Sequence, residues 1–162
     1  MRLFLIKFKF IFLISIILFV ISASASCSKA VKPSEDLVRI KAILNSVTKL
    51  QDKYKGKDFG DFMAIVSPKY NASFKNAVEK AMTESDEIDL AIYVDRIDMD
   101  KDSARVNLHW EGAWKKGGKP INNNGNSVFA FSNEAEPKLT GIAGSNPFEL
   151  YSISSAPSER GN

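Results

Sequence analysis

The sequence contains a single histidine and a single cysteine, and this limits the chemistry open to the chain. His109 lies in an alternating segment with polar Asn107 and Glu111 two positions away on either side. An imidazole can act as a general base near neutral pH, and Glu111 could lie beside it. Because the apolar residues of a strand form its covered side, we expect His109 to face solvent or a dimer partner instead. A catalytic zinc site usually takes three protein ligands, so we predict no metal.

Acidic residues form the second cluster with chemical potential. They are Asp89, Asp95, Asp98, Asp100 and Asp102. A calcium loop needs oxygen ligands at set spacing, a glycine at the turn and a distal glutamate. The stretch 98–102 has alternating acids but neither the glycine nor the glutamate, and Lys101 adds a positive charge. We interpret it as a solvated turn between strands. The chain also has no glycine-rich phosphate loop or nucleophile elbow, so no cofactor is predicted.

Residues 1–26 have the order of a secretory signal. Three basic residues come first, and a run of 12 residues from Phe10 to Ile21 follows that is apolar except for Ser15. Small residues then lead to position 26. This order is typical of a cleavable signal, and a membrane span would need about 20 apolar residues. An uncleaved N-terminal anchor is the alternative interpretation.

Cys27 follows the small residues directly, and a lone cysteine cannot form an internal disulfide. The segment Ser24-Ala25-Ser26-Cys27 resembles a bacterial lipobox, in which the cysteine is acylated and becomes the new N-terminus. Ser24 departs from the usual Leu, Val or Ile, which leaves ordinary cleavage after Ala25 open; the protein would then be periplasmic or secreted. The resemblance implies a membrane partner through the lipid anchor. In the envelope lipoproteins of two-membrane bacteria that this segment resembles, an acidic residue after the cysteine retains some members at the inner membrane. Ser28 is not acidic, so the resemblance implies the outer membrane, facing the periplasm.

The charge of the chain resides in this leader. The whole sequence has 22 basic and 19 acidic residues. Removing Arg2, Lys7 and Lys9 leaves 19 of each, so the remaining 136 residues are formally neutral. Nucleic-acid binding requires a clustered basic face, so no nucleic-acid partner is predicted. We expect a signal peptide at 1–26, a lipidated tether at 27–33, one domain at 34–151 and a loose tail at 152–162.

Helical periodicity fills the first half of the domain. Apolar residues recur at three- and four-residue steps after Ser34, a favourable N-cap, and Gly56 ends this first helix. Asp58 caps a shorter helix that stops before Pro68. A third helix begins near residue 71 or 73.

The period then changes to two. Ile88, Leu90, Ile92 and Val94 alternate with smaller or polar residues, namely Asp89, Ala91, Tyr93 and Asp95. Residues 104–114 alternate over a longer stretch. We interpret 115–126 as a loop, 128–132 as a third strand and 138–142 as a fourth. Helices followed by a strand meander predict an α+β fold, with three N-terminal helices packed on a curved antiparallel sheet of four or more strands.

Three segments in this order resemble the NTF2-like superfamily, which includes SnoaL-like and ketosteroid-isomerase-like proteins. They are Lys57-Asp58-Phe59-Gly60-Asp61-Phe62-Met63-Ala64-Ile65-Val66-Ser67-Pro68-Lys69-Tyr70, Asp102-Ser103-Ala104-Arg105-Val106 and Gly141-Ile142-Ala143-Gly144-Ser145-Asn146-Pro147-Phe148. The resemblance spans roughly residues 34–150. It implies a conical fold and often a homodimer, here through the sheet, but no single activity.

Two functions remain open, with pure assembly through the polar sheet face around His109 as a third possibility. In the first, the protein is a non-catalytic envelope lipoprotein whose domain binds a small apolar ligand or a protein partner. The candidate pocket residues are Trp110, Trp114, Phe129, Phe131 and Tyr93, although the tryptophans and phenylalanines also suit a plain core. In the second, by resemblance, an acid inside the cone acts as the base of an isomerase or dehydratase. Asp89 and Tyr93 are candidate parts of such a site, which also needs a group to stabilise an oxyanion.

Overall fold

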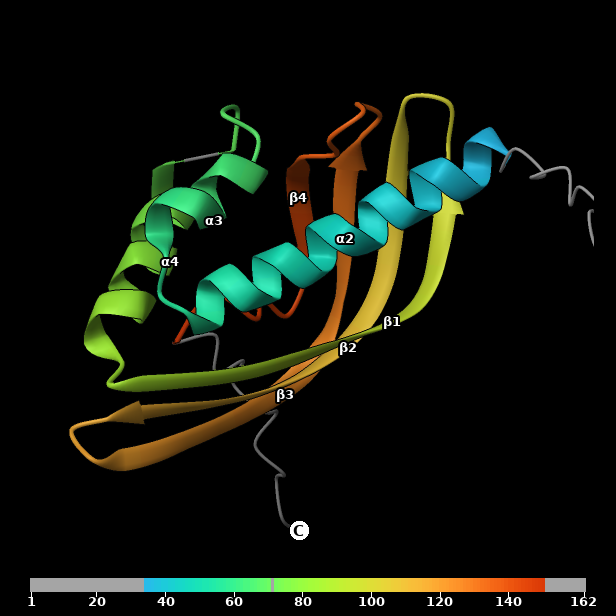
Figure 1. Ribbon diagram of the computed structural model, residues 1–162. Coiled ribbons are helices and arrows are strands. Elements are labelled where there is room, and N and C mark those ends of the chain that lie inside the picture. The colour runs from blue at the N-terminus through green and yellow to red at the C-terminus, as the bar shows by residue number, and fades with distance from the viewer. Residues whose placement is uncertain (1–33, 71, 151–162) are drawn as a thin grey trace, which may run out of the picture. The chain divides into compact units, whose positions relative to one another are not determined.

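The computed structural model describes residues 34–70 and 72–150, so the predicted signal peptide, Cys27 and the tail lie outside the described residues. Its elements are α2 (Glu35–Lys55), α3 (Phe59–Ile65), α4 (Ala72–Glu84), β1 (Glu87–Met99), β2 (Ser103–Lys116), β3 (Lys119–Ser132) and β4 (Leu139–Gly144). The three helices pack on one antiparallel sheet (Figure 1). The α+β prediction is therefore confirmed. Within the described ranges, none of the helices is long and apolar enough to span a membrane.

Helix α2 begins and ends at the residues that the sequence predicts. The Ser34 hydroxyl accepts a hydrogen bond from the Leu37 backbone N–H at 3.3 Å, and Gly56 is the C-cap. Such an N-cap satisfies one of the unpaired donors of the first turn. One side of the helix packs on the sheet through Ile43, Val47, Leu50 and Tyr54, all of which are buried.

The shorter helices close one end of the sheet (Figure 1). The Asp58 carboxylate caps α3 by accepting a hydrogen bond from the Asp61 backbone N–H, and this bond is the main reason why the pKa of Asp58 lies below its usual value. The Lys53 ammonium of α2 forms ion pairs with the carboxylates of Asp58 and Asp61. Phe62 of α3 and Phe74 of α4 are buried in the core, where both contact Phe148.

The sheet has the strand order β1-β2-β3-β4, and its two faces differ in character. The face under the helices, here called the covered face, carries Ile88, Leu90, Val106, Leu108, Trp110, Trp114, Phe129 and Phe131, all of them buried. The other face, here called the open face, carries Asp89, Ala91, Tyr93, Asp95, Asn107, His109, Glu111, Ala113, Asn122 and Asn124. Alternation in the sequence thus assigned the faces of β1 and β2 correctly.

The predicted loop at 115–126 is wrong. Strand β3 already begins at Lys119, and Lys116 pairs with Lys119 across a two-residue turn. Both turn residues, Gly117 and Gly118, have positive φ angles of 56° and 77°. Positive φ at both central positions is typical of the type I′ hairpin, which glycine adopts without steric cost.

Side chains occupy part of both sheet edges. On β1, the Ile92 backbone N–H donates to Gln51 Oε1 of α2 at 2.8 Å, and the register slips at Asp95, between Val94 and Arg96. On β3, residues 119–126 lie beyond the reach of β4, whose pairing starts at Ser127. There the Asn124 N–H donates to Asn123 Oδ1, and Pro120 has no N–H. Such features discourage another strand from adding to an edge.

Candidate functional site

The four aromatic pocket candidates on the covered face lie in the core. Trp110, Trp114, Phe129 and Phe131 are at most 2% exposed. The two tryptophan rings meet edge to face, and Phe129 contacts both Phe131 and Phe148. Trp114 borders a surface depression of about 380 Å³. Trp110, Phe129 and Phe131 line neither this depression nor the two depressions of the open face. These side chains therefore fill the interior of the cone.

Polar atoms of the tryptophans are satisfied inside that core. The Trp114 indole N–H donates to the Tyr54 hydroxyl at 3.0 Å, and the Trp110 N–H reaches the Ser127 hydroxyl and the Ser145 carbonyl, each at 3.2 Å. Tyr54 is fully buried, and burial is the main cause that raises its pKa above the usual value. The Tyr54 hydroxyl is therefore protonated at neutral pH.

No carboxylate or imidazole joins Tyr54 in the core of residues 34–70 and 72–150. The buried polar side chains there are Ser46, Ser85 and Ser127, each of which hydrogen-bonds a backbone carbonyl. Proton abstraction beside a carbonyl needs a base within hydrogen-bond reach of the substrate. Glu149 is a partly buried carboxylate whose charge adds to the rise in the pKa of Tyr54, although burial is the larger cause.

Tyr93, the fifth pocket candidate, is not brought together with the other four. It lies on the open face with its side chain 47% exposed, and its ring stacks on His109 with the centroids 4.9 Å apart and an interplanar angle of 15°. His109 Nδ1 lies 2.8 Å from Asp95 Oδ1. Tyr93, His109 and Asp95 are here called the open-face triad. His109 thus lies on the polar face, as the alternation predicts.

The open-face triad is an exposed cluster. The His109 and Asp95 side chains are 48% and 50% exposed, so both remain in contact with water. A His–Asp pair can transfer protons, but catalysis also needs a stabilised oxyanion and a site that excludes water. The flat stack of two rings instead offers an apolar surface with polar edges, which is the character of residues enriched in protein interfaces.

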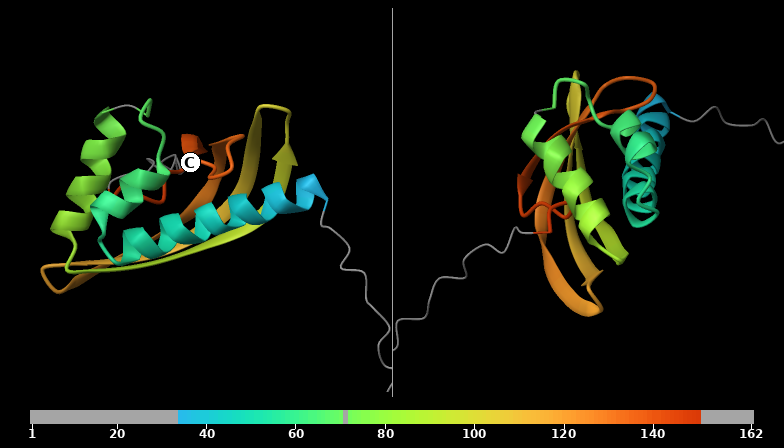
Figure 2. Two further views of the ribbon diagram at one scale, coloured as in Figure 1. Left: turned by 45° about the horizontal axis from the view of Figure 1, so that its top comes forward. Right: turned by 90° about the vertical axis from the view of Figure 1, so that its left-hand side faces the viewer.

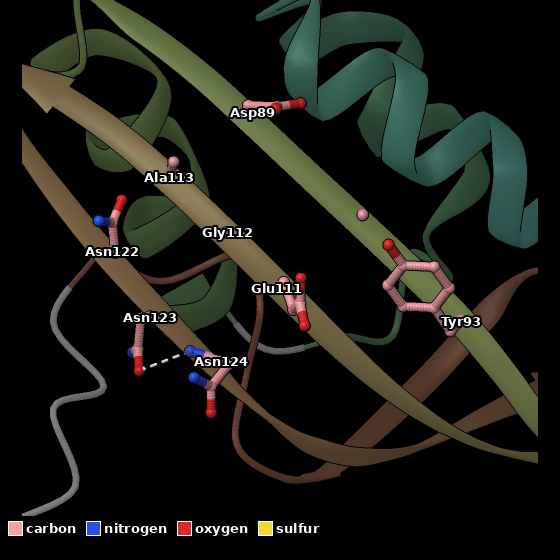
Figure 3. A pocket seen from close by; sticks show the side chains of 9 residues that line it. Asp89, Tyr93, Glu111, Gly112, Ala113, Asn122, Asn123 and Asn124 are labelled. Atoms are coloured by element: carbon pink, nitrogen blue, oxygen red, sulfur yellow. Dashed lines mark hydrogen bonds between the residues drawn. The ribbon is translucent and has the colours of Figure 1, made fainter.

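A shallow depression of about 470 Å³ adjoins the triad on the open face. Its lining is Asp89, Ala91, Tyr93, Glu111, Gly112, Ala113, Asn122, Asn123 and Asn124 (Figure 3). Asp89 is paired with Lys55 of α2 at 2.7 Å. Asp89 and Tyr93, the parts proposed for an acid-base site, therefore lie on the face away from the core and not inside the cone.

A second depression, of about 340 Å³, lies on the other side of His109. It includes Asp95, Asn107, Asn126, Val128 and Ala143 among its lining residues. The two depressions therefore flank the open-face triad. Sequence reasoning missed the contribution of Asn122 and Asn124, because it treated their segment as a loop, and it missed the contact between Asp95 and His109.

The acidic turn carries ion pairs and amide contacts. Asp98 is held by Arg96 at 3.0 Å and by the Asn107 side-chain amide, also at 3.0 Å, while Asp100 faces Arg105 at 3.7 Å. The residues that the structure describes contain no cluster of three or more metal-ligating side chains. The contacts assign this stretch a structural role in the turn between β1 and β2.

Comparison with solved structures identifies the fold. An NTF2-like superfamily protein from Salmonella enterica covers 76% of this chain and 99% of its own, with a TM-score of 0.57 and 10% identity. A candidate scytalone dehydratase from Novosphingobium aromaticivorans covers 78% and 97%, with a TM-score of 0.60 and 12% identity. A ketosteroid isomerase-like protein from Erwinia carotovora covers 71% and 100%, with a TM-score of 0.50 and 15% identity.

No family model and no curated protein matches the sequence. The structural neighbours nevertheless agree with one another, and each is covered almost completely. The chain therefore has the NTF2-like fold. At identities this low the likeness extends to the fold alone, because the same fold hosts unrelated functions.

Proposed function

We propose that the protein is a non-catalytic envelope lipoprotein, anchored through an acylated Cys27, whose NTF2-like domain binds a protein partner on the open face. The partner that we propose is a second copy of the same chain. The anchor is supported by the sequence: a leader with the order of a secretory signal is followed directly by the sole cysteine.

One observation carries the proposal for the domain. The interior of the cone is occupied by aromatic and aliphatic side chains, including Trp110, Trp114 and Phe129, which are at most 2% exposed. A small apolar ligand would have to displace this packed core, at a cost comparable to creating a cavity of its own size. The open face, by contrast, presents an exposed ring stack between two depressions.

The chemistry of the open face favours a protein over a small molecule. Its central side chains, Tyr93 and His109, present flat rings, while Asn107, Glu111 and Asn124 supply hydrogen-bonding groups around them. An aromatic centre with a polar rim is the general anatomy of a protein interface. Two such faces related by a twofold axis would be self-complementary if donors on one met acceptors on the other.

The anchor is tested by labelling. The full chain and a Cys27→Ala variant are expressed in a bacterium supplied with labelled fatty acid. We expect label on the wild-type protein alone. Equal labelling of both proteins, or of neither, contradicts acylation of Cys27.

The open face is tested by sedimentation of the chain from residue 27 onward, carrying Cys27→Ser so that neither lipid nor a disulfide intervenes. We expect a concentration-dependent dimer that Tyr93→Asp disrupts, because the new charge would be desolvated in the interface. Val38→Asp is the matched control, since Val38 is an exposed apolar residue on α2. A chain that stays monomeric at every concentration, or a dimer that Tyr93→Asp leaves intact, contradicts the proposed interface.

An isomerase or dehydratase remains the alternative. It would require a base that reaches a bound substrate, and His109 with Asp95 is the pair available on the open face. Loss of a measured activity on His109→Gln, with the fold intact, would favour that alternative over the binding function.

A further inference from the structure

Three large apolar side chains lie exposed on the first three turns of α2. Leu37 is 42% exposed, Val38 54% and Leu44 39%. Among the described residues, the only other large apolar side chain of comparable exposure is Tyr93 on the open face. Single exposed apolar residues are normal on a protein surface, but their concentration on one short stretch of helix points to a contact.

Helix geometry brings these side chains onto one surface. Leu37 and Leu44 are seven residues apart, which is close to two turns, so they share a side of the helix. Lys41 is exposed between them, and Val38 lies one turn before Lys41. We call Leu37, Val38, Lys41 and Leu44 the α2 outer surface. The opposite side of the helix is buried against the sheet through Ile43, Val47 and Leu50.

The position of this surface along the chain indicates what covers it. Ser34, the first described residue, caps α2 and follows Cys27 by seven positions. Seven residues span at most about 25 Å when fully extended. If Cys27 carries a lipid, as the proposed function states, the first turns of α2 stay within that distance of the membrane. Tethering of this kind replaces a bimolecular encounter by an intramolecular one and favours even a weak contact.

We propose that the α2 outer surface rests on the lipid surface that holds the Cys27 anchor, an inference that depends on the proposed function. Leu37, Val38 and Leu44 insert at the level of the lipid headgroups, in the way of an amphipathic helix that lies in the interface plane. The Lys41 ammonium reaches phosphate groups from the same surface.

The charges near the helix start restrict the kind of membrane. Glu35 and Asp36 are exposed in the first turn, beside Leu37 and Val38. Anionic lipids would repel the carboxylates of Glu35 and Asp36. This repulsion would offset the attraction between Lys41 and a strongly anionic surface. The contact therefore suits a zwitterionic surface and depends mainly on burial of the three apolar side chains.

This docking would also orient the domain. Helix α2 lies on the covered side of the sheet (Figure 2). With its outer surface on the membrane, the sheet lies beyond the helix, and the open-face triad is turned away from the lipid. Two copies docked on one membrane would both turn their open faces away from the lipid, so docking and face-to-face pairing exclude each other for a given copy. A docked copy presents its open face to the aqueous side.

The experiment uses the chain from Cys27 to Asn162, attached through its only thiol to a maleimide lipid in phosphatidylcholine nanodiscs. This attachment does not depend on acylation in the cell. A second lipid carries a nitroxide at its headgroup, and its relaxation effect on methyl and aromatic NMR signals is measured. We expect the methyl signals of Leu37, Val38 and Leu44 to lose most of their intensity, while the ring signals of Tyr93 on the open face keep theirs.

Two variants make the test specific. Val38→Gln alone should reduce the broadening of the Leu37 and Leu44 methyl signals. Changing Leu37, Val38 and Leu44 together to Gln should remove the broadening of the Thr48 methyl signal, which reports on exposed α2 in that variant. Ala64→Gln, an exposed apolar change on α3, should leave the broadening of α2 signals unchanged. Unaltered indole N–H signals of Trp110 and Trp114 report that each variant is folded.

The outcomes separate the two proposals. Equal broadening of α2 and open-face signals, or stronger broadening on the open face, overturns the docking while leaving the anchor intact. Absence of fatty-acid label on Cys27 in cells overturns the anchor and with it the docking.

Discussion

The Tyr54 hydroxyl accepts a hydrogen bond from the Trp114 indole N–H at 3.0 Å, and both side chains are almost completely buried. The bond joins the last turn of α2 to the far end of β2, two elements that are distant in sequence. It gives the aromatic core a fixed polar contact. It also makes Tyr54 the residue at which the stability of the helix-sheet contact can be measured.

Changing Tyr54 to Phe should lower the free energy of unfolding by about 1–3 kcal/mol, because it leaves the buried Trp114 N–H without its acceptor. Urea unfolding at neutral pH measures the loss. Tyr93→Phe is the matched control, since it removes a phenol hydroxyl from an exposed side chain. Equal stability of the two variants would contradict the importance of the Tyr54–Trp114 bond.

Stability should fall when the pH rises above about 10, the ordinary pKa of tyrosine. Burial raises the pKa of Tyr54, so the unfolded chain releases this proton at a lower pH than the folded chain does. Above that pH the unfolded state binds fewer protons than the folded state, so the free energy of unfolding decreases. The stability that protonated Tyr54 contributes is therefore fully present below the ordinary pKa and is lost as the pH rises above it. The pKa of Tyr70 is raised for the same main reason. Urea unfolding across the alkaline range should show a shallower decline for Tyr54→Phe than for the wild type.

Trp110→Ala should cost about 3–5 kcal/mol, as is usual for removal of a large aromatic side chain from a core. Trp110 is 1% exposed, and its loss also removes the indole N–H that donates to the Ser127 hydroxyl and the Ser145 carbonyl. A domain of ordinary stability, about 5–15 kcal/mol, would be close to unfolding. Thermal melting followed by circular dichroism measures this. A melting temperature within a degree or two of the wild type would contradict the assignment of β2 faces.

Two glycines should respond oppositely to alanine. A Cβ on Gly112 would lie 2.3 Å from the Trp114 ring, so Gly112→Ala should displace that ring and cost about 1–3 kcal/mol. A Cβ on Gly60, in α3, would meet no atom within 4 Å. Gly60→Ala should therefore be neutral or stabilise by up to about 1 kcal/mol, because alanine favours the helix. Denaturant unfolding of both variants tests the pair.

The sequence predicts the elements whose two sides differ in polarity. Alternation along residues 104–114 assigns Trp110 to the core and His109 to the open face, and the structure confirms both. The method fails at residues 119–126, where β3 extends with both faces at least partly exposed and therefore shows no contrast. The paired glycines at 117 and 118 were the available signal, because they are typical of a two-residue hairpin.

The open-face triad was predictable only in part. Periodicity places Tyr93 and His109 on the same face, but their direct pairing depends on the register between β1 and β2. Asp95 meets His109 at a bulge, where the register slips by one residue. No residue type near Asp95 marks that slip, since a bulge arises from how two strands fit together and not from one strand alone.

The occupied strand edges have a consequence for crowding. Molecules that share a membrane plane, as proposed here, meet one another repeatedly with similar orientation and at high local density. A strand whose backbone N–H and C=O groups stayed exposed could then pair with a strand of the next molecule, and repeated pairing would join many copies into one extended sheet. Fewer backbone N–H groups are available for such pairing than the strand edges would otherwise offer. Gln51 accepts the hydrogen bond of the Ile92 N–H, Asn123 accepts that of the Asn124 N–H, and Pro120 has no N–H. The domain can therefore be concentrated on a surface without adding further copies strand to strand.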